Sequence, residues 1–207
     1  GSILIQNAQL ETGLAATDVL TSGATTAKAG VLIDLPRINY DANGENGALL
    51  LEPSRQQLYP YSEYFNTSYA LNGGTTLTDN YGISPEGVQN ATRYLGTGTS
   101  GFGRTYTLTN GADYTISVYV KSNTSDTQYC RIVGDSSNVS SDLEVTTEWT
   151  RIDYTWTSGG LTNKTNGIFR DSSNNDIDIL IFALQLEAGS YATSYIPNHG
   201  TSGGVTR

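Results

Sequence analysis

The clearest strands of this chain are segments in which apolar and polar residues alternate. Residues 113–122 read DYTISVYVKS. A period of two places alternate side chains on opposite faces of a β-strand. The residues expected to face the core are Tyr114, Ile116, Val118 and Val120. Those expected on the open face are Thr115, Ser117, Tyr119 and Lys121.

Three further segments extend this pattern toward the C-terminus. In residues 128–133 the predicted inward residues are Cys130 and Ile132, and the outward ones are Tyr129, Arg131 and Val133. In residues 149–157 the inward residues are Ile152, Tyr154 and Trp156, and the outward ones are Arg151, Asp153 and Thr155. Residues 177–186 are almost continuously apolar, which is typical of a central strand covered on both faces.

The spacing of these segments predicts the fold class. From Leu58 onward, strand-like segments recur every 10–15 residues or so, separated by clusters of Gly, Asn, Asp and Ser. No segment shows a helical period of useful length. The composition agrees, because 23 Gly, 14 Tyr and no Met leave the chain poor in strong helix formers. We therefore predict an all-β protein, an antiparallel β-sandwich of the jelly-roll type.

Charge and rare residues exclude several function classes. The net charge of −9 would repel a phosphate backbone, so nucleic acid is not an expected partner. A single cysteine, Cys130, excludes a multi-cysteine zinc site, and a single histidine, His199, argues against a histidine-centred catalytic triad. No apolar run reaches the roughly 18 residues of a membrane span, so membrane insertion is not expected.

The two ends of the chain carry an internal repeat. Residues 5–17 (IQNAQLETGLAAT) match residues 181–193 (IFALQLEAGSYAT), with Gln-Leu-Glu, a Gly and Ala-Thr in common. We interpret residues 1–30 as the tail of a preceding similar module and a linker. On this interpretation residues 31–57 are a lead-in segment, 58–197 the jelly-roll domain and 198–207 a linker to a following region. Chance similarity between two strands is the alternative.

Several motifs occur in an order that resembles a known family. They are LLLEPSR at 49–55, YSEYF at 61–65, DYTISVYVKS at 113–122, EWTRIDYTW at 148–156 and LQLEAGSYATSYIP at 184–197. Together they resemble the carbohydrate-binding-module-like jelly rolls of bacteriophage structural and tail proteins. The resemblance implies a jelly-roll fold and a non-catalytic role on the virion surface, acting outside the cell. It does not name a ligand.

These motifs suggest a function in adhesion. We expect a non-catalytic module that binds polysaccharide or cell-surface glycan, with neighbouring modules of the same virion protein as further partners. One alternative is a purely structural module that oligomerises a phage fibre. Another is a module appended to a polysaccharide-degrading enzyme.

Aromatic and basic residues on two successive strands form the candidate ligand site. Tyr119 and Lys121 lie on the outward face of one strand, and Tyr129 and Arg131 on that of the next. Sugars stack on aromatic rings, and the planar arginine fork addresses vicinal hydroxyls or a carboxylate. The alternative is that this face packs against a loop or a neighbouring subunit.

Other aromatic residues are assigned differently. Trp156 is in phase with the core positions, and Trp149, at a strand start, is expected at the core edge. A platform on which a sugar stacks is the alternative for both. A dense set of tyrosines near the first strand is typical of an interface, with either a ligand or a second copy in a homo-oligomer. This set comprises Tyr59, Tyr61, Tyr64 and Tyr69.

Neither a catalytic centre nor a metal site is evident. Glycoside hydrolysis needs two carboxylates across a cleft, and no spacing here pairs them, so we do not expect an enzyme. Cellular modules of the resembled fold often hold a structural calcium, but Ala183, Leu184 and Asn66 stand where its ligands are expected. Acidic loops such as 171–178 are a weaker calcium candidate, and solvated turn acids are the favoured interpretation.

Overall fold

The computed structural model describes residues 37–39, 47–66, 69–135, 138–159 and 164–206. Residues 1–54 form one compact unit and residues 55–206 a second. In the first unit the described strands are β1 (Arg37–Asn39) and β2 (Ala48–Leu50), which pair antiparallel. The predicted tail at 1–30 lies outside the described residues, as do residues 31–36 and 40–46 of the predicted lead-in.

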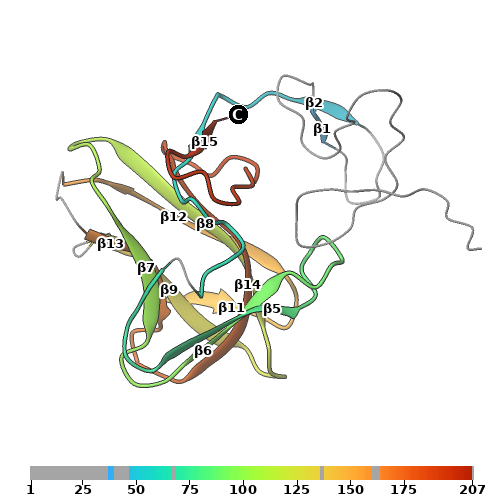
Figure 1. Ribbon diagram of the computed structural model, residues 1–207, viewed down its shortest axis with the longest axis vertical. Helices are drawn as coiled ribbons and strands as arrows, with labels where there is room; N and C mark the ends of the chain where they lie inside the picture. Colours follow the sequence, from blue (N-terminus) through green and yellow to red (C-terminus); the bar gives the residue numbers. More distant parts are fainter. Residues whose placement is uncertain (1–36, 40–46, 67–68, 136–137, 160–163, 207) are drawn as a thin grey trace, which may run out of the picture. The chain divides into compact units, whose positions relative to one another are not determined.

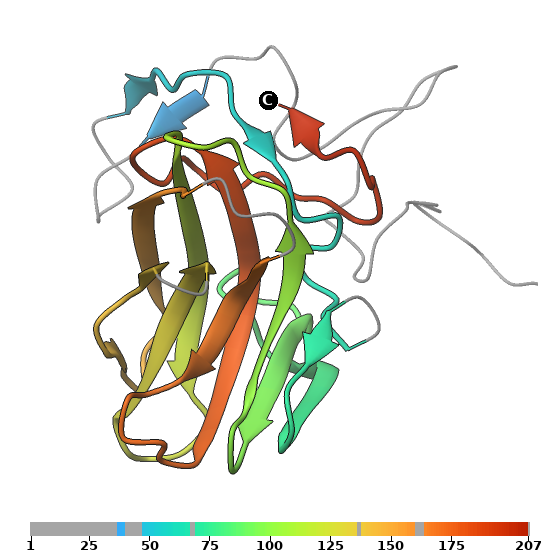
Figure 2. The same cartoon turned by 90° about the vertical axis from the view of Figure 1, so that its left-hand side faces the viewer.

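The second unit is an antiparallel sandwich of two main sheets (Figures 1 and 2). One sheet has the strand order β12-β8-β14-β6-β5. Its strands are β5 (Thr75–Gly82), β6 (Ala91–Gly96), β8 (Asp113–Ser122), β12 (Thr150–Thr157) and β14 (Ile177–Ala188). Figure 2 shows the longer strands of the sandwich running side by side along the domain.

The other sheet has six strands in the order β10-β9-β13-β7-β4, with β11 also paired to β9. Its strands are β4 (Ala70–Leu71), β7 (Gly101–Tyr106), β9 (Gln128–Asp135), β10 (Asn138–Val139), β11 (Leu143–Val145) and β13 (Lys164–Arg170). The described residues contain strands, turns and loops but no helix, which confirms the predicted all-β jelly roll. They accordingly include no helix of the length and apolarity that a membrane crossing needs.

The alternating segments form the predicted strands. The apolar positions of β8, from Tyr114 to Val120, are buried in the core, and so are Cys130 and Ile132 of β9. Trp156 is also buried there, as expected. Strand β14 is central, paired with β6 on one side and β8 on the other, and buried along nearly its whole length.

Strand β14 changes neighbours halfway along. It pairs with β6 over residues 177–181, and a bulge follows in which Ala183 has a φ of 57°. Beyond the bulge, residues 57–62 take the place of β6. The Leu58 amide donates to the Leu186 carbonyl (2.8 Å), and the Leu184 amide donates to the Ser62 carbonyl (3.0 Å). The bulge thus lets one strand border two different segments.

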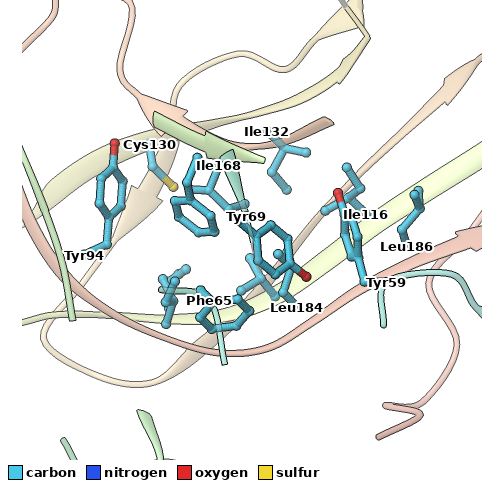
Figure 3. Close-up of a cluster of buried hydrophobic side chains, with 14 of the residues drawn as sticks. Tyr59, Phe65, Tyr69, Tyr94, Ile116, Cys130, Ile132, Ile168, Leu184 and Leu186 are labelled. Atoms are coloured by element: carbon cyan, nitrogen blue, oxygen red, sulfur yellow. The ribbon is translucent and has the colours of Figure 1, made fainter. Parts of the chain in front are cut away.

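Aromatic rings fill the space between the sheets at one end of the core (Figure 3). The Phe102 ring lies 5.3 Å from Tyr94, 5.8 Å from Phe65 and 5.9 Å from Tyr69, measured between ring centroids. Tyr59 lies 5.5 Å from Tyr69 and is fully buried. The prediction that Tyr59 and Tyr69 belong to an interface is therefore wrong. Both rings pack inside the core cluster, where Tyr69 also contacts Phe65 at 5.3 Å between ring centroids.

The C-terminal residues pack on the domain over 198–206. The Asn198 side chain is buried and donates to the Tyr59 carbonyl at 2.9 Å. Strand β15 (Val205–Thr206) pairs with β3 (Gln56–Gln57). These residues, expected to be a linker, are thus part of the folded unit, and so are residues 55–57 of the expected lead-in. Backbone pairing of this kind leaves no signal in so polar a sequence.

Candidate functional site

The structure separates the four predicted site residues into two pairs. Tyr119 and Lys121 lie on β8 in the five-stranded sheet, whereas Tyr129 and Arg131 lie on β9 in the six-stranded sheet. The expectation that they share one face is wrong. Both edges of β8 are already occupied, by β12 and β14, so the chain crosses to the other sheet before forming β9.

The first pair belongs to a group of aromatic and basic side chains on the outer surface of the five-stranded sheet, which we call the Tyr119 face. Register places Arg151 and Phe182 on either side of Tyr119, and Leu180 beside Lys121. Arg93 is paired with Leu180 on its other side. The face comprises Tyr81, Arg93, Tyr119, Lys121, Trp149, Arg151, Leu180 and Phe182.

Tyr119 and Arg151 form the centre of this face. The Arg151 guanidinium lies 5.7 Å from the centroid of the Tyr119 ring, and its Nη2 donates to Ser117 Oγ at 2.8 Å. The Phe182 ring is 6.4 Å from Tyr119 on the other side. Phe182 is buried while Tyr119 stays partly exposed, so an accessible ring lies next to a buried one on this face.

Trp149 is the residue of this face that the sequence misassigned. It lies outside the described core cluster and is partly exposed, and its indole Nε1 donates to the Ile83 carbonyl at 3.2 Å. The predicted position at the core edge is therefore wrong. Trp149 precedes β12 with the outward parity of Arg151, and that parity was the signal that could have identified it.

Arg93 and Asp178 close one side of the face with a bidentate ion pair. Arg93 Nε and Nη2 donate to the two Asp178 oxygens at 2.8 and 2.6 Å, and the Tyr81 ring lies 5.0 Å from the guanidinium. The hydrogen bond from Arg93 lowers the pKa of Asp178. Because the two charges neutralise each other within the protein, this ion pair holds the Arg93 side chain in place at one side of the Tyr119 face.

The second predicted pair is differently placed. Tyr129 is 46% exposed and lies opposite Glu144. Arg131 Nε donates to the Arg170 carbonyl at 3.0 Å and lies 3.9 Å from Asp142. The arginine fork is thus partly engaged by the protein itself, which leaves Tyr129 as the accessible group of this surface.

Part of the outer surface of the five-stranded sheet is covered by the chain itself. The segment 189–198 folds over the end of β14, where the buried Glu187 accepts hydrogen bonds from the Thr193 amide (2.8 Å) and hydroxyl (2.7 Å). Gln185 accepts from the Ile196 amide at 2.7 Å. The Gln-Leu-Glu motif therefore fixes this covering segment and leaves the Tyr119 face as the accessible remainder.

A buried carboxylate lies at the other end of the covering segment. Glu63 accepts from the Tyr195 hydroxyl at 2.7 Å and from Asn90 Nδ2 at 3.3 Å, and His199 Nε2 lies 3.9 Å away. Burial is the main cause that raises the pKa of Glu63. The position lies behind the covering segment and is closed to a polymer.

Glu63 predicts a pH-dependent stability. Its folded pKa lies above the ordinary value of 4.5, so its contribution is fully present below 4.5 and is lost as pH rises through the folded pKa. Glu63→Gln mimics the protonated carboxyl group and therefore removes the part of the pH dependence of stability that comes from residue 63. In thermal unfolding, we expect the midpoint of the wild type to fall relative to Glu63→Gln between pH 4.5 and pH 8. The same substitution at an exposed position, Glu144→Gln, is the control for the exchange of a glutamate for glutamine. A difference between wild type and Glu63→Gln that stays constant over this pH range would contradict the assignment.

The acidic loop at 171–178 uses its carboxylates internally. Asp171 accepts from the Asn175 amide and side chain at 2.9 and 2.6 Å, and Asp178 pairs with Arg93. Within the described ranges, no group of three or more His, Cys, Asp or Glu side chains is arranged to hold a metal ion.

Comparison with known proteins identifies the fold. No family model and no curated protein matches the sequence. Among solved structures, the CBM22-1–GH10 modules of a Clostridium thermocellum endo-1,4-β-D-xylanase, complexed with xylohexaose, align with a TM-score of 0.50 at 20% identity. That alignment covers 67% of this chain and 29% of the xylanase chain. The fold is therefore that of carbohydrate-binding modules.

Two other solved structures are similar at lower scores. The CBM22-1 xylan-binding domain of a Paenibacillus barcinonensis protein aligns over 67% of this chain and 94% of its own, with a TM-score of 0.45 at 14% identity. A tailspike protein of bacteriophage CBA120 aligns over 63% of this chain and 21% of its own, with a TM-score of 0.43 at 13% identity.

Proposed function

We propose that residues 55–206 form a non-catalytic module that binds polysaccharide or cell-surface glycan through the Tyr119 face. The observation that carries the proposal is the grouping of Tyr119, Trp149, Lys121 and Arg151 on the accessible part of one sheet. Sequence order alone does not bring them together, since they come from β8 and from the start of β12.

The chemistry of this grouping suits a sugar chain. A partly exposed aromatic ring offers a rigid apolar surface for the C–H face of a pyranose. The arginine and lysine donors beside it can address ring hydroxyls or a carboxylate. The ring and donors lie on paired strands, so they are held in place before the ligand arrives, which reduces the ordering cost of binding.

Removing the central ring tests the assignment. For a polysaccharide that the protein binds, we expect Tyr119→Ala to weaken binding about tenfold, from about 1–1.5 kcal/mol of lost ring contact. Tyr129→Ala, the matched change on the opposite sheet, should leave binding unchanged. Affinity gel electrophoresis measures both, with circular dichroism to confirm folding. If Tyr129→Ala weakens binding and Tyr119→Ala does not, the binding site lies on the surface around Tyr129 of β9 instead.

The biological setting follows from the resemblance to phage proteins. It supports a place on the virion surface, where the module would hold the particle close to a glycan-coated host. Single sites of this kind bind weakly, and several modules on one particle raise the overall affinity through effective concentration.

The internal repeat supports such an arrangement of modules. The three side chains that fix the covering segment, Gln185, Glu187 and Thr193, match Gln9, Glu11 and Thr17. The bulge residue Ala183, with its φ of 57°, matches Asn7, a residue type that tolerates this conformation better. We therefore propose that residues 1–30 correspond in sequence to the end of a similar module followed by a linker.

A structural role in a fibre is the second candidate. It is favoured by exposed apolar side chains on the outer surface of the six-stranded sheet, namely Tyr129 and Val139. A fibre module would form a stable oligomer through such a surface. Sedimentation of the purified protein distinguishes the candidates, because a glycan-binding module has no need to associate.

A further inference from the structure

Lys121 and Arg151 differ from Arg93, the third cation of the Tyr119 face, which forms an ion pair with Asp178. Basic residues that do form ion pairs in the described part of the chain include Arg55, Arg93, Arg131, Arg170 and His199. Lys121 and Arg151 form no ion pair with any carboxylate in the described part of the chain. They are therefore the cations that this domain leaves uncompensated at the accessible face.

The two cations lie around the same ring. Arg151 is the cross-strand neighbour of Tyr119, and Lys121 lies two residues along β8 on the same outward face. The one hydrogen bond that the Arg151 guanidinium makes to the described residues is from Nη2 to Ser117 Oγ. Its Nε is buried, so the donors that remain for a ligand are those on Nη1 and the second hydrogen of Nη2. A ligand stacked on Tyr119 would place its substituents between an arginine fork and an ammonium group.

We propose that the Tyr119 face selects polysaccharides that carry carboxylates, that is, glycans containing uronic acids. This inference rests on the proposed glycan-binding function and names its ligand class. The planar arginine fork matches a carboxylate with two parallel hydrogen bonds, and charge-assisted bonds are roughly twice as strong as neutral ones. A neutral sugar would leave both cations without a counter-charge.

The acidic character of the whole chain does not oppose this selection. The net charge of −9 is spread over the protein, and at physiological salt charges farther apart than about 8 Å are largely screened. The nearest acid on the same strand, Asp153, is exposed and forms no ion pair with Arg151.

Matched acidic and esterified polymers test the inference. The probes are polygalacturonate, alginate and hyaluronan, each beside its uncharged ester, together with xylan, mannan and β-glucan as neutral polymers. In affinity gel electrophoresis we expect at least one acid polymer to retard the protein about tenfold more strongly than its ester. Raising the salt concentration should weaken that retardation.

Variants locate the effect. Lys121→Gln and Arg151→Gln should each reduce retardation by the acid polymer about tenfold, whereas Arg131→Gln, on the opposite sheet, should leave it unchanged. Circular dichroism confirms that each variant is folded.

Two results would overturn the acidic ligand class and leave the glycan-binding function intact. One is equal binding of an acid polymer and its ester, and the other is wild-type binding by both Lys121→Gln and Arg151→Gln. Retardation by neutral polymers alone would also overturn the acidic ligand class while supporting glycan binding. Retardation by none of the polymers would overturn the inference together with the proposed function.

Discussion

Replacing Phe102 by alanine is expected to lower the free energy of unfolding by about 3–5 kcal/mol. Phe102 is fully buried, and its ring contacts Phe65, Tyr69 and Tyr94 at centroid distances of 5.3–5.9 Å. It is contributed by β7 of one sheet and meets Tyr94 from β6 of the other. The cavity left by its removal cannot close without moving the two sheets.

Urea denaturation measures this loss directly. The matched control is Leu71→Ala on neighbouring β4, since Leu71 is paired opposite Phe102 in register but is 42% exposed. We expect the control to change the free energy of unfolding by less than about 1 kcal/mol. Equal losses in the two variants would mean that these rings do not form the contact between the sheets.

Replacing Glu187 by alanine is expected to cost about 2–4 kcal/mol, because it leaves buried donors without a partner. Those donors are the Thr193 amide and hydroxyl and Gln185 Nε2, each 2.7–2.8 Å from a Glu187 oxygen. Arg55 Nε, 3.9 Å from the carboxylate, loses its counter-charge as well. The segment 189–198 should then detach more readily from the end of β14.

Limited proteolysis together with urea denaturation tests this prediction. We expect Glu187→Ala to be cleaved within 189–198 under conditions in which the wild type is intact. Glu187→Gln keeps one acceptor oxygen, so its resistance to cleavage and its stability should lie between those of the wild type and Glu187→Ala. Resistance of Glu187→Ala to cleavage, with wild-type stability, would show that other contacts hold the covering segment.

The local pattern of residues was sufficient to predict the strands but not their neighbours. The alternation in β8 and β12 identified the buried side of each strand, because a period of two is a property of the strand alone. Which strands pair is decided by the whole sandwich. Tyr129 and Arg131 are close to Tyr119 in sequence and lie on the other sheet, since β8 has no free edge.

The candidate site was predicted in part for the same reason. Tyr119 and Lys121 lie on an accessible face as expected, but Thr115 and Ser117 on the same side of β8 are buried. Their burial comes from the chain folding over the end of β14, a long-range contact that leaves no periodic signal. Trp149 and Arg151 join the face only through the pairing of β12 with β8.

The most direct test of glycan binding is affinity gel electrophoresis of the wild-type protein against a panel of neutral and acidic polysaccharides, with and without calcium. Retardation by one polysaccharide class, reduced in Tyr119→Ala and retained in Tyr129→Ala, is the result predicted here. Migration unchanged by every polymer in the panel would contradict a glycan-binding module and favour the structural role in a fibre.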